Sequence, residues 1–200
     1  HTAVSTFWEA ILSQMYTATG GWRLYKTDAS GNLNWYEATT NVLTPTIPIK
    51  QKEWTHIAFV RNSGTLYCYV NGKAAGSVSS SYNYTGGTNG EIEIGKGTYA
   101  SSLPIDAHIS DVRIVVGTPV YTGVFTPPSG PLTTTGGTYP SSTNVNTSFT
   151  ASHTKLLLNM TQGSIRDDSQ KTHSIELKMV QLHHQAVSYT HLRAHETACN

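Results

Sequence analysis

The stretch EWTHIAFVRNSGTLYCYVNGKAAGSV, residues 53–78, decides the fold. A first run rich in β-branched and aromatic residues is followed by the turn residues Asn62-Ser-Gly64 and a second run of the same kind, 65–70. Such runs, bounded by turn residues, are typical of strands with a buried face. The dipeptide Asn71-Gly72 tolerates the positive φ angles of a hairpin tip, so residues 73–78 are predicted to run back as a third strand.

Short segments with the same pattern lie on both sides of this stretch. Residues 22–26 and 32–36 flank a turn signal at 28–31. Residues 91–95 alternate strictly, with two isoleucines on one face, and 108–116 alternate as well. Strands joined by tight turns, with no convincing helical pattern, predict an all-β fold, an antiparallel β-sandwich.

Composition narrows the possible partners. The chain has 200 residues, of which 38% are hydrophobic and only 12% charged, and its formal net charge is +1. This charge gives no electrostatic case for binding nucleic acid or an anionic membrane. No apolar run approaches the roughly 18 residues that span a bilayer. Two cysteines, Cys68 and Cys199, are too few for a disulfide framework. We therefore expect a soluble protein without nucleic-acid binding or membrane insertion.

The chain is predicted to have four parts. Residues 1–127 carry the strand patterns, and 128–153 is a tract rich in Pro, Thr, Ser and Gly that is predicted to be an extended linker. Residues 154–185 begin with a new apolar strand. The last part, 186–200, resembles a translated transposon-end adapter from DNA sequencing. We exclude it from functional reasoning, including its two histidines at zinc-ligand spacing.

Four motifs together resemble a known family, and they are Trp54–Arg61, Leu66–Gly72, Ile92–Gly95 and Ile109–Ile114. Their order and spacing resemble the laminin-G-like branch of the concanavalin A-like lectin/glucanase superfamily. The continuation Gly117–Pro128 resembles the version found in tail and other structural proteins of bacteriophages. The resemblance implies a jelly-roll sandwich that is N-terminally truncated, with its opening strands before His1. It also makes 154–185 resemble the start of a second, incomplete copy, so that the chain would be a fragment of a longer protein.

Loop aromatics are the first candidates for ligand binding. A pyranose ring offers an apolar face that stacks on an aromatic ring, and hydroxyls that hydrogen-bond to amides and carboxylates. The loop that starts at residue 81 places tyrosines beside asparagines, and two adjacent rings at 35 and 36 should face opposite ways. The competing interpretation is that these rings cover the core. The candidate ligand-binding residues are Trp35, Tyr82, Asn83, Tyr84, Asn89 and Tyr99.

Catalysis is predicted to be absent. Glu91 and Glu93 alternate on one strand, about 6.5–7 Å apart along it, as the acids of the superfamily's glucanases do, but the third acid of that pattern is missing. Cys68 lies mid-strand, where a buried inert thiol is expected. His56 and His108 lie within predicted strands, where a structural role is expected. The alternative is a glycoside hydrolase, or its accessory domain, that uses Glu91 and Glu93.

Calcium is the one cofactor that the resemblance suggests, because laminin-G-like domains often bind it through loop oxygens. The candidate ligands are Asp28, Asp106 and Asp111. Asp111 also suits a structural hydrogen bond or a pairing with Arg113. No acidic cluster of the EF-hand type is present, so we expect that no cofactor is required.

The resemblance implies a non-catalytic carbohydrate-binding or adhesion module of a phage tail or another virion structure. Its expected partners are a cell-surface glycan and other virion proteins, and its expected location is the virion or, failing that, the extracellular space. A purely structural spacer that binds no sugar is a further alternative.

Overall fold

The computed structural model describes residues 8–14, 21–27, 30–84, 91–97, 103–159 and 168–169. Within this part of the chain the regular structure is strand, apart from a 3-10 turn at Ala151–His153. No helix in the described residues is long and apolar enough to cross a membrane. The all-β prediction is confirmed.

The larger sheet is six-stranded, with the order β4-β3-β2-β1-β8 and with β9 beside β1. Its strands are β1 (Trp8–Gln14), β2 (Trp22–Thr27), β3 (Asn32–Glu37), β4 (Thr40–Leu43), β8 (Ile92–Ile94) and β9 (Leu103–Pro104). All pairs are antiparallel except β1 with β9. The predicted hairpin around residues 28–31 is therefore confirmed as β2–β3.

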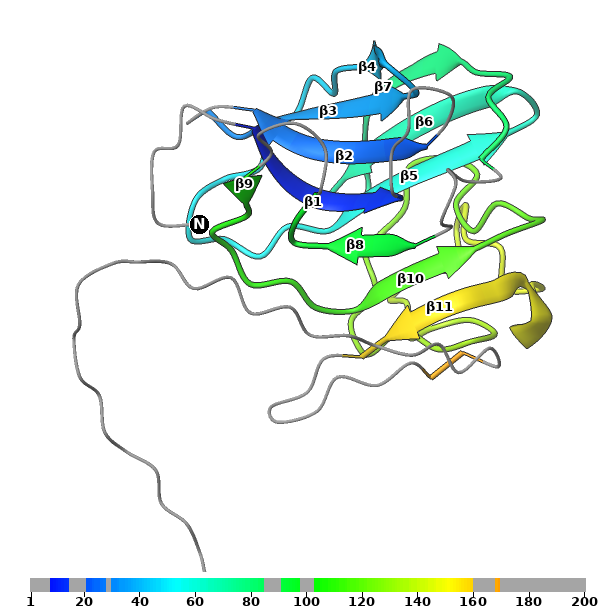
Figure 1. Cartoon of the computed structure of the whole chain (residues 1–200). Helices are drawn as coiled ribbons and strands as arrows, with labels where there is room; N and C mark the ends of the chain where they lie inside the picture. The colour runs from blue at the N-terminus through cyan, green and yellow to red at the C-terminus, as the bar shows by residue number, and fades with distance from the viewer. Residues whose placement is uncertain are drawn as a thin grey trace, which may run out of the picture.

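The second sheet is three-stranded, with the order β5-β6-β7, and lies face to face with the first (Figure 1). Its strands are β5 (Ile57–Asn62), β6 (Thr65–Val70) and β7 (Lys73–Ser79). The predicted tip adopts the expected backbone, with φ of 49° at Asn71 and 74° at Gly72. The three strands predicted within residues 53–78 are thus confirmed, although the first begins later, at Ile57.

The main core lies between the two sheets. Leu24 and Leu33 of the larger sheet pack in one cluster with Leu66, Cys68 and Val70 of β6. Period-two alternation produces this arrangement, because every second side chain of a strand points to the same face. The two isoleucines of β8 differ from this pattern. Ile94 is partly buried, whereas Ile92 at the start of this edge strand is 38% exposed.

A second core covers the opposite face of the three-stranded sheet. Val60 and Tyr69 point outward there and are buried under residues 116–149, which we name the cover segment. The side chains of this segment that pack against the sheet are Val120, Tyr121, Phe125, Val145 and Phe149. Residues 128–153 are therefore packed on the domain, in contrast to the extended linker that composition predicted.

After the cover segment the chain pairs with the same domain. Strand β11 (Thr154–Leu158) forms an antiparallel pair with β10 (Val112–Val115). The strand at which a second copy is predicted to begin thus forms a two-stranded sheet with β10. Most of 154–185, beyond residue 159, and all of 186–200 lie outside the described residues, so the interpretation of these parts stays a prediction.

Close backbone contacts hold the cover segment on the turn between β6 and β7. The amide of Phe125 donates to the carbonyl of Gly72 at 3.1 Å. Within the segment itself, the amide of Thr122 donates to the carbonyl of Asn144 at 2.9 Å. A Cβ added at Gly72 would lie 1.9 Å from the carbonyl oxygen of Phe125. Glycine is required here for its φ of 74° and for this approach.

A chain of polar side chains lies beneath the cover segment. Arg113 donates to the hydroxyl of Tyr139 at 3.1 Å, and that hydroxyl lies 2.9 Å from the hydroxyl of Tyr121. The hydroxyl of Tyr121 in turn lies 3.5 Å from Nε2 of His56. Burial, with a smaller contribution from the charge of Arg113, lowers the pKa of His56 to about 4. The folded domain therefore holds His56 neutral.

The contact between Gly72 and Phe125 gives a first prediction. Gly72→Ala should lower the free energy of unfolding through both the clash and the strained φ. Its control is Gly64→Ala, where φ is 79° and nothing lies within 4 Å, so that only a backbone strain of roughly 1–2 kcal/mol applies. Urea denaturation measures both variants. Equal losses would contradict the close approach of the cover segment.

Acid should weaken the fold through His56. Its folded pKa of about 4 lies below the ordinary 6.5, so stability is full above pH 6.5 and falls as the pH drops through 6.5 toward 4. Full protonation would remove about 3 kcal/mol. His56→Gln should flatten this part of the stability profile, measured by denaturation at stepped pH, whereas the exposed control His108→Gln should leave it unchanged. If the stability profile of His56→Gln has the same slope as that of wild type, the folded domain does not hold His56 neutral.

Candidate functional site

The predicted loop tyrosines turn back onto the domain. The hydroxyl of Tyr82 donates to the carbonyl of Gly21 at 2.9 Å, and the hydroxyl of Tyr84 donates to the carboxylate of Glu37. Burial and the bond to Glu37 raise the pKa of Tyr84. Arg61 lies 4.9 Å above the ring of Tyr84. Both hydroxyls are thus engaged within the domain, which favours the interpretation of a cover over the core.

Trp35 needs a correction. It is only 7% exposed, and its ring stacks between Trp22 at 5.1 Å and Phe59 at 4.6 Å. A ring in this position cannot stack on a sugar. The two adjacent rings do face opposite ways, but the one outside the main core is Tyr36, which is partly buried with Arg23 4.6 Å above it. Alternation alone could not tell which of the two rings faced inward.

The other predicted ligand contacts divide into described and undescribed residues. Asn83 is exposed between the two loop tyrosines. Asn89 and Tyr99 lie outside the described residues. The described part of the loop around residue 82 therefore offers one exposed amide, that of Asn83.

The two candidate carboxylates lie on the larger sheet. Glu93 is on β8, and its carboxylate accepts a hydrogen bond from the hydroxyl of Ser13 at 3.4 Å. Glu91 precedes the strand and is exposed. Neither residue lines the pocket described below. The chain's lack of catalysis stays a prediction.

Two of the three calcium candidates lie in the described part of the chain. Asp106 and Asp111 are both exposed, and Asp111 accepts a hydrogen bond from the hydroxyl of Ser110 at 2.8 Å. Asp28 lies outside the described residues. Among the residues that are described, no group of three or more His, Cys, Asp or Glu side chains could hold a metal ion. Calcium binding stays an untested prediction that these two carboxylates alone do not support.

Cys68 behaves as an inert core residue. It is fully buried in the main core, and burial raises the pKa of its thiol to about 12. A thiol with this pKa is protonated at neutral pH and is a poor nucleophile. Of the two histidines predicted to be structural, His56 joins the polar chain under the cover segment. His108 is exposed and precedes β10.

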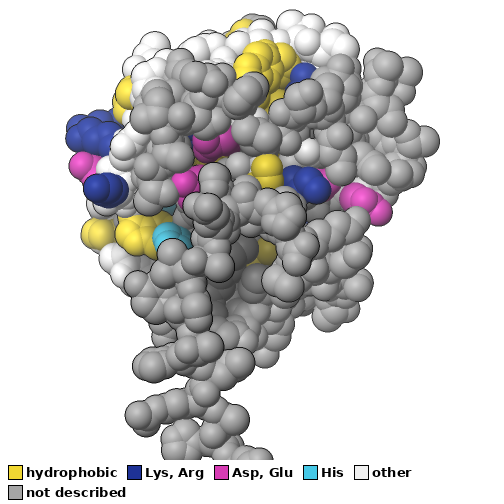
Figure 2. Space-filling view, turned by 60° about the vertical axis from the view of Figure 1, so that its left-hand side comes forward, with side chains coloured by type: hydrophobic (Ala, Val, Ile, Leu, Met, Phe, Trp, Pro, Cys, Tyr) yellow, Lys and Arg dark blue, Asp and Glu magenta, His cyan; other side chains and the backbone are white. Residues whose placement is uncertain are grey.

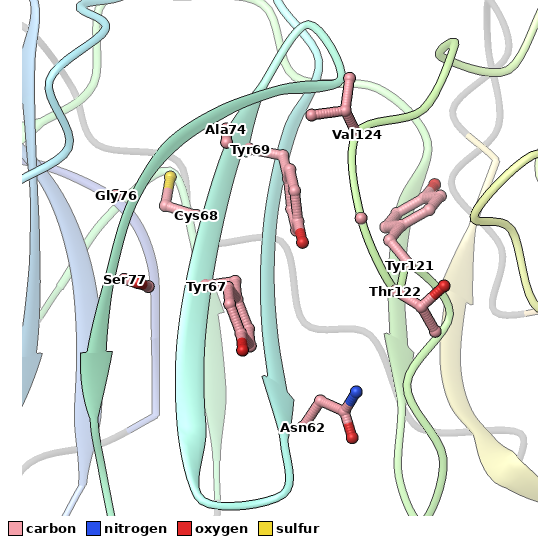
Figure 3. A pocket seen from close by; sticks show the side chains of 11 residues that line it. Asn62, Tyr67, Cys68, Tyr69, Ala74, Gly76, Ser77, Tyr121, Thr122 and Val124 are labelled. Carbon is pink, nitrogen blue, oxygen red and sulfur yellow. The ribbon is translucent and has the colours of Figure 1, made fainter.

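The described residues form a pocket that the sequence did not predict (Figure 3). One wall is the outer face of β6 and β7 with Tyr67, Tyr69 and Ser77, and the other is residues 121–124 of the cover segment. Asn62 at the end of β5 closes one end. We name this pocket the tyrosine groove. Its volume is about 330 Å³, within the range of small-ligand sites.

The groove combines aromatic surface with uncharged polar groups. The rings of Tyr67 and Tyr69 are nearly parallel, with an interplanar angle of 19° and centroids 6.4 Å apart. Tyr69 is only 3% exposed and forms the floor, whereas Tyr67 is partly exposed. Asn62, Ser77 and Thr122 contribute amide and hydroxyl groups. Among the described residues, no Asp, Glu, Lys, Arg or His lines the groove.

The sequence held part of the signal for this site. In Thr65-Leu-Tyr-Cys-Tyr-Val70 the tyrosines alternate with apolar residues, which places both rings on the face away from the main core. The opposite wall comes from residues more than fifty positions later in the chain. Its packing on the sheet depends on long-range contacts that a strand pattern does not reveal.

The visible charges do not form a large patch of one sign. On the face shown in Figure 2, the Lys and Arg side chains of the described residues lie near Asp and Glu side chains and among apolar ones. This distribution agrees with the small net charge and gives no support for a nucleic-acid interface on that face.

Comparison with known proteins identifies the fold family. A laminin G family model, described as the concanavalin A-like lectin/glucanases superfamily, matches residues 2–118. No curated protein and no solved structure matches the chain. The match covers more than half of the chain and includes both sheets of the sandwich. The chain therefore belongs to the concanavalin A-like lectin/glucanases superfamily.

Proposed function

We propose that this domain is a non-catalytic carbohydrate-binding or adhesion module and that its ligand lies in the tyrosine groove. One observation carries the proposal. A partly exposed tyrosine ring lies in a preformed pocket beside one amide and two hydroxyl groups. The superfamily supports a carbohydrate-binding type of module in general.

The groove suits the two surfaces of a sugar. The apolar face of a pyranose can stack on the Tyr67 ring, because that ring is held parallel to the buried ring of Tyr69. The sugar hydroxyls can then exchange hydrogen bonds with Asn62, Ser77 and Thr122, whose groups act as both donors and acceptors. Because both walls are held by backbone hydrogen bonds, little ordering is needed on binding.

A binding role fits the groove better than hydrolysis does. Glycoside hydrolases need two carboxyl groups on either side of the scissile bond. The described residues that line the groove supply none, and Glu91 and Glu93 lie on or beside strand β8 of the other sheet. Glu93→Gln tests the alternative, since a hydrolase would then release no oligosaccharide, whereas a binding module would keep its affinity.

We propose further that the module belongs to a phage tail or another virion structure. The support is the resemblance of Gly117–Pro128 to such proteins. A small, open groove predicts weak binding to a single site, and repeated copies on a virion would raise the overall avidity for a host-cell glycan. The proposed partners are that glycan and neighbouring virion proteins.

The groove and the loop that starts at residue 81 can be told apart by substitution. Tyr67→Ala should weaken binding on a glycan array, and in titration with the best glycan, by about tenfold, because it removes the stacking ring. Tyr67→Phe should keep most of the affinity. Asn83→Ala, in the exposed loop, is the control and should bind like wild type. If Asn83→Ala loses binding and Tyr67→Ala keeps it, the binding site is in the loop and not in the groove. If no glycan on the array binds, the proposed function is wrong.

A further inference from the structure

The two ends of the tyrosine groove differ in chemistry. Ala74 pairs with Tyr69 across β6 and β7, and Val124 of the opposite wall lies near the same end (Figure 3). Toward the other end lie Asn62 and the Tyr67 ring, with Thr122 on the opposite wall (Figure 3). The groove thus has an apolar end and a polar end.

The apolar end presents an exposed hydrophobic side chain on a backbone that is held by hydrogen bonding. Val124 is 55% exposed, although it lies beside a pocket. Asn144 fixes this part of the chain, because its side-chain amide donates to the carbonyl of Val124 at 2.7 Å. A Cβ at the neighbouring Gly123 would lie 2.9 Å from the same asparagine. Val124 can therefore contact a small apolar group of a ligand without rearrangement.

The polar end offers hydrogen bonds without charge. The side-chain oxygen of Asn62 accepts from the hydroxyl of Ser63 at 3.1 Å, and the two amide hydrogens on its nitrogen are suited to ligand oxygens. The hydroxyl of Thr122 donates to the carbonyl of Asn144 at 3.4 Å, and its oxygen can accept from a ligand. A ligand carboxylate placed here would lose water and gain no cationic partner from the groove, which is unfavourable.

We infer that the groove selects neutral sugars that carry a methyl-bearing substituent. The inference rests on the proposed function and names its ligand class. The sugar ring stacks on Tyr67, its hydroxyls face Asn62 and Thr122, and its methyl group contacts Ala74 and Val124. An acetamido group and the C6 methyl of a 6-deoxy sugar both supply this methyl, whereas uronic and sialic acids add a charge that the groove does not pair.

Four glycan classes test the inference with the full chain immobilised at high density. They are N-acetylhexosamine oligomers, glycans ending in 6-deoxyhexoses, unsubstituted neutral hexose oligomers, and glycans containing uronic or sialic acid. We expect one or both methyl-bearing classes to bind about fourfold more tightly than the unsubstituted class, as burial of one methyl group predicts. The acidic class should bind most weakly. Comparison of the N-acetylhexosamine class with the 6-deoxyhexose class shows which substituent supplies the methyl group.

Two substitutions at exposed positions make the test specific to this groove. Val124→Ser should abolish the preference for methyl-bearing sugars, measured as the ratio of the affinities for methyl-bearing and unsubstituted classes. Its control is Val116→Ser, since Val116 is 53% exposed and lies outside the groove. Thr122→Lys adds a cation at the polar end and should raise the binding of acidic glycans about threefold to fivefold.

Failure of this inference can be distinguished from failure of the proposed function. Equal binding of methyl-bearing and unsubstituted sugars, a Val124→Ser variant with an unchanged preference, or strong binding of acidic glycans by wild type would overturn this inference. If Tyr67→Ala still weakens binding in those cases, the proposed function stands. If no glycan binds, or if Tyr67→Ala has no effect, both the proposed function and this inference fail.

Discussion

The three-stranded sheet carries large side chains on both faces, and this constraint determines the rest of the structure. Strand β6 presents Leu66, Cys68 and Val70 to one side and Tyr67 and Tyr69 to the other. The larger sheet can cover only the first side. Residues 116–149 cover the second, because apolar surface left in water would lower stability. The C-terminal part of the described chain is thus as necessary to the sandwich as its strands.

The cover is incomplete, and the uncovered part is the groove. Val60 and Tyr69 are buried beneath the cover segment, whereas Tyr67 packs against the same cluster but stays partly exposed. Tyr121 belongs to both regions, since its ring stacks on Phe125 at 3.7 Å in the second core and also lines the groove. The contacts that stabilise the second core therefore also fix the wall of the candidate site.

Local patterns predicted the strands well because a strand's period and its turn residues are local properties. The hairpins around residues 28–31 and 71–72 are examples. Patterns failed where two placements were equally consistent with alternation, as for Trp35 and Tyr36. They also failed for residues 128–153, where few apolar residues are scattered in a polar tract. Val145 and Phe149 are buried there through contacts with a sheet formed by residues far earlier in the chain.

The same distinction explains why two loop tyrosines that the sequence suggested as ligand contacts turn back onto the domain. Tyrosines in loops look accessible, but a hydroxyl beside a sheet edge readily finds a backbone carbonyl or a carboxylate, as Tyr82 and Tyr84 do. Tyrosines in a strand look buried, yet period two places every second one outside the main core. Whether such a ring meets solvent depends on how far the covering segment extends. In this domain Tyr69 is buried under the cover segment, whereas Tyr67, two positions away on the same strand, packs against the same cluster and stays partly exposed. This difference is the reason that the proposed stacking ring is Tyr67.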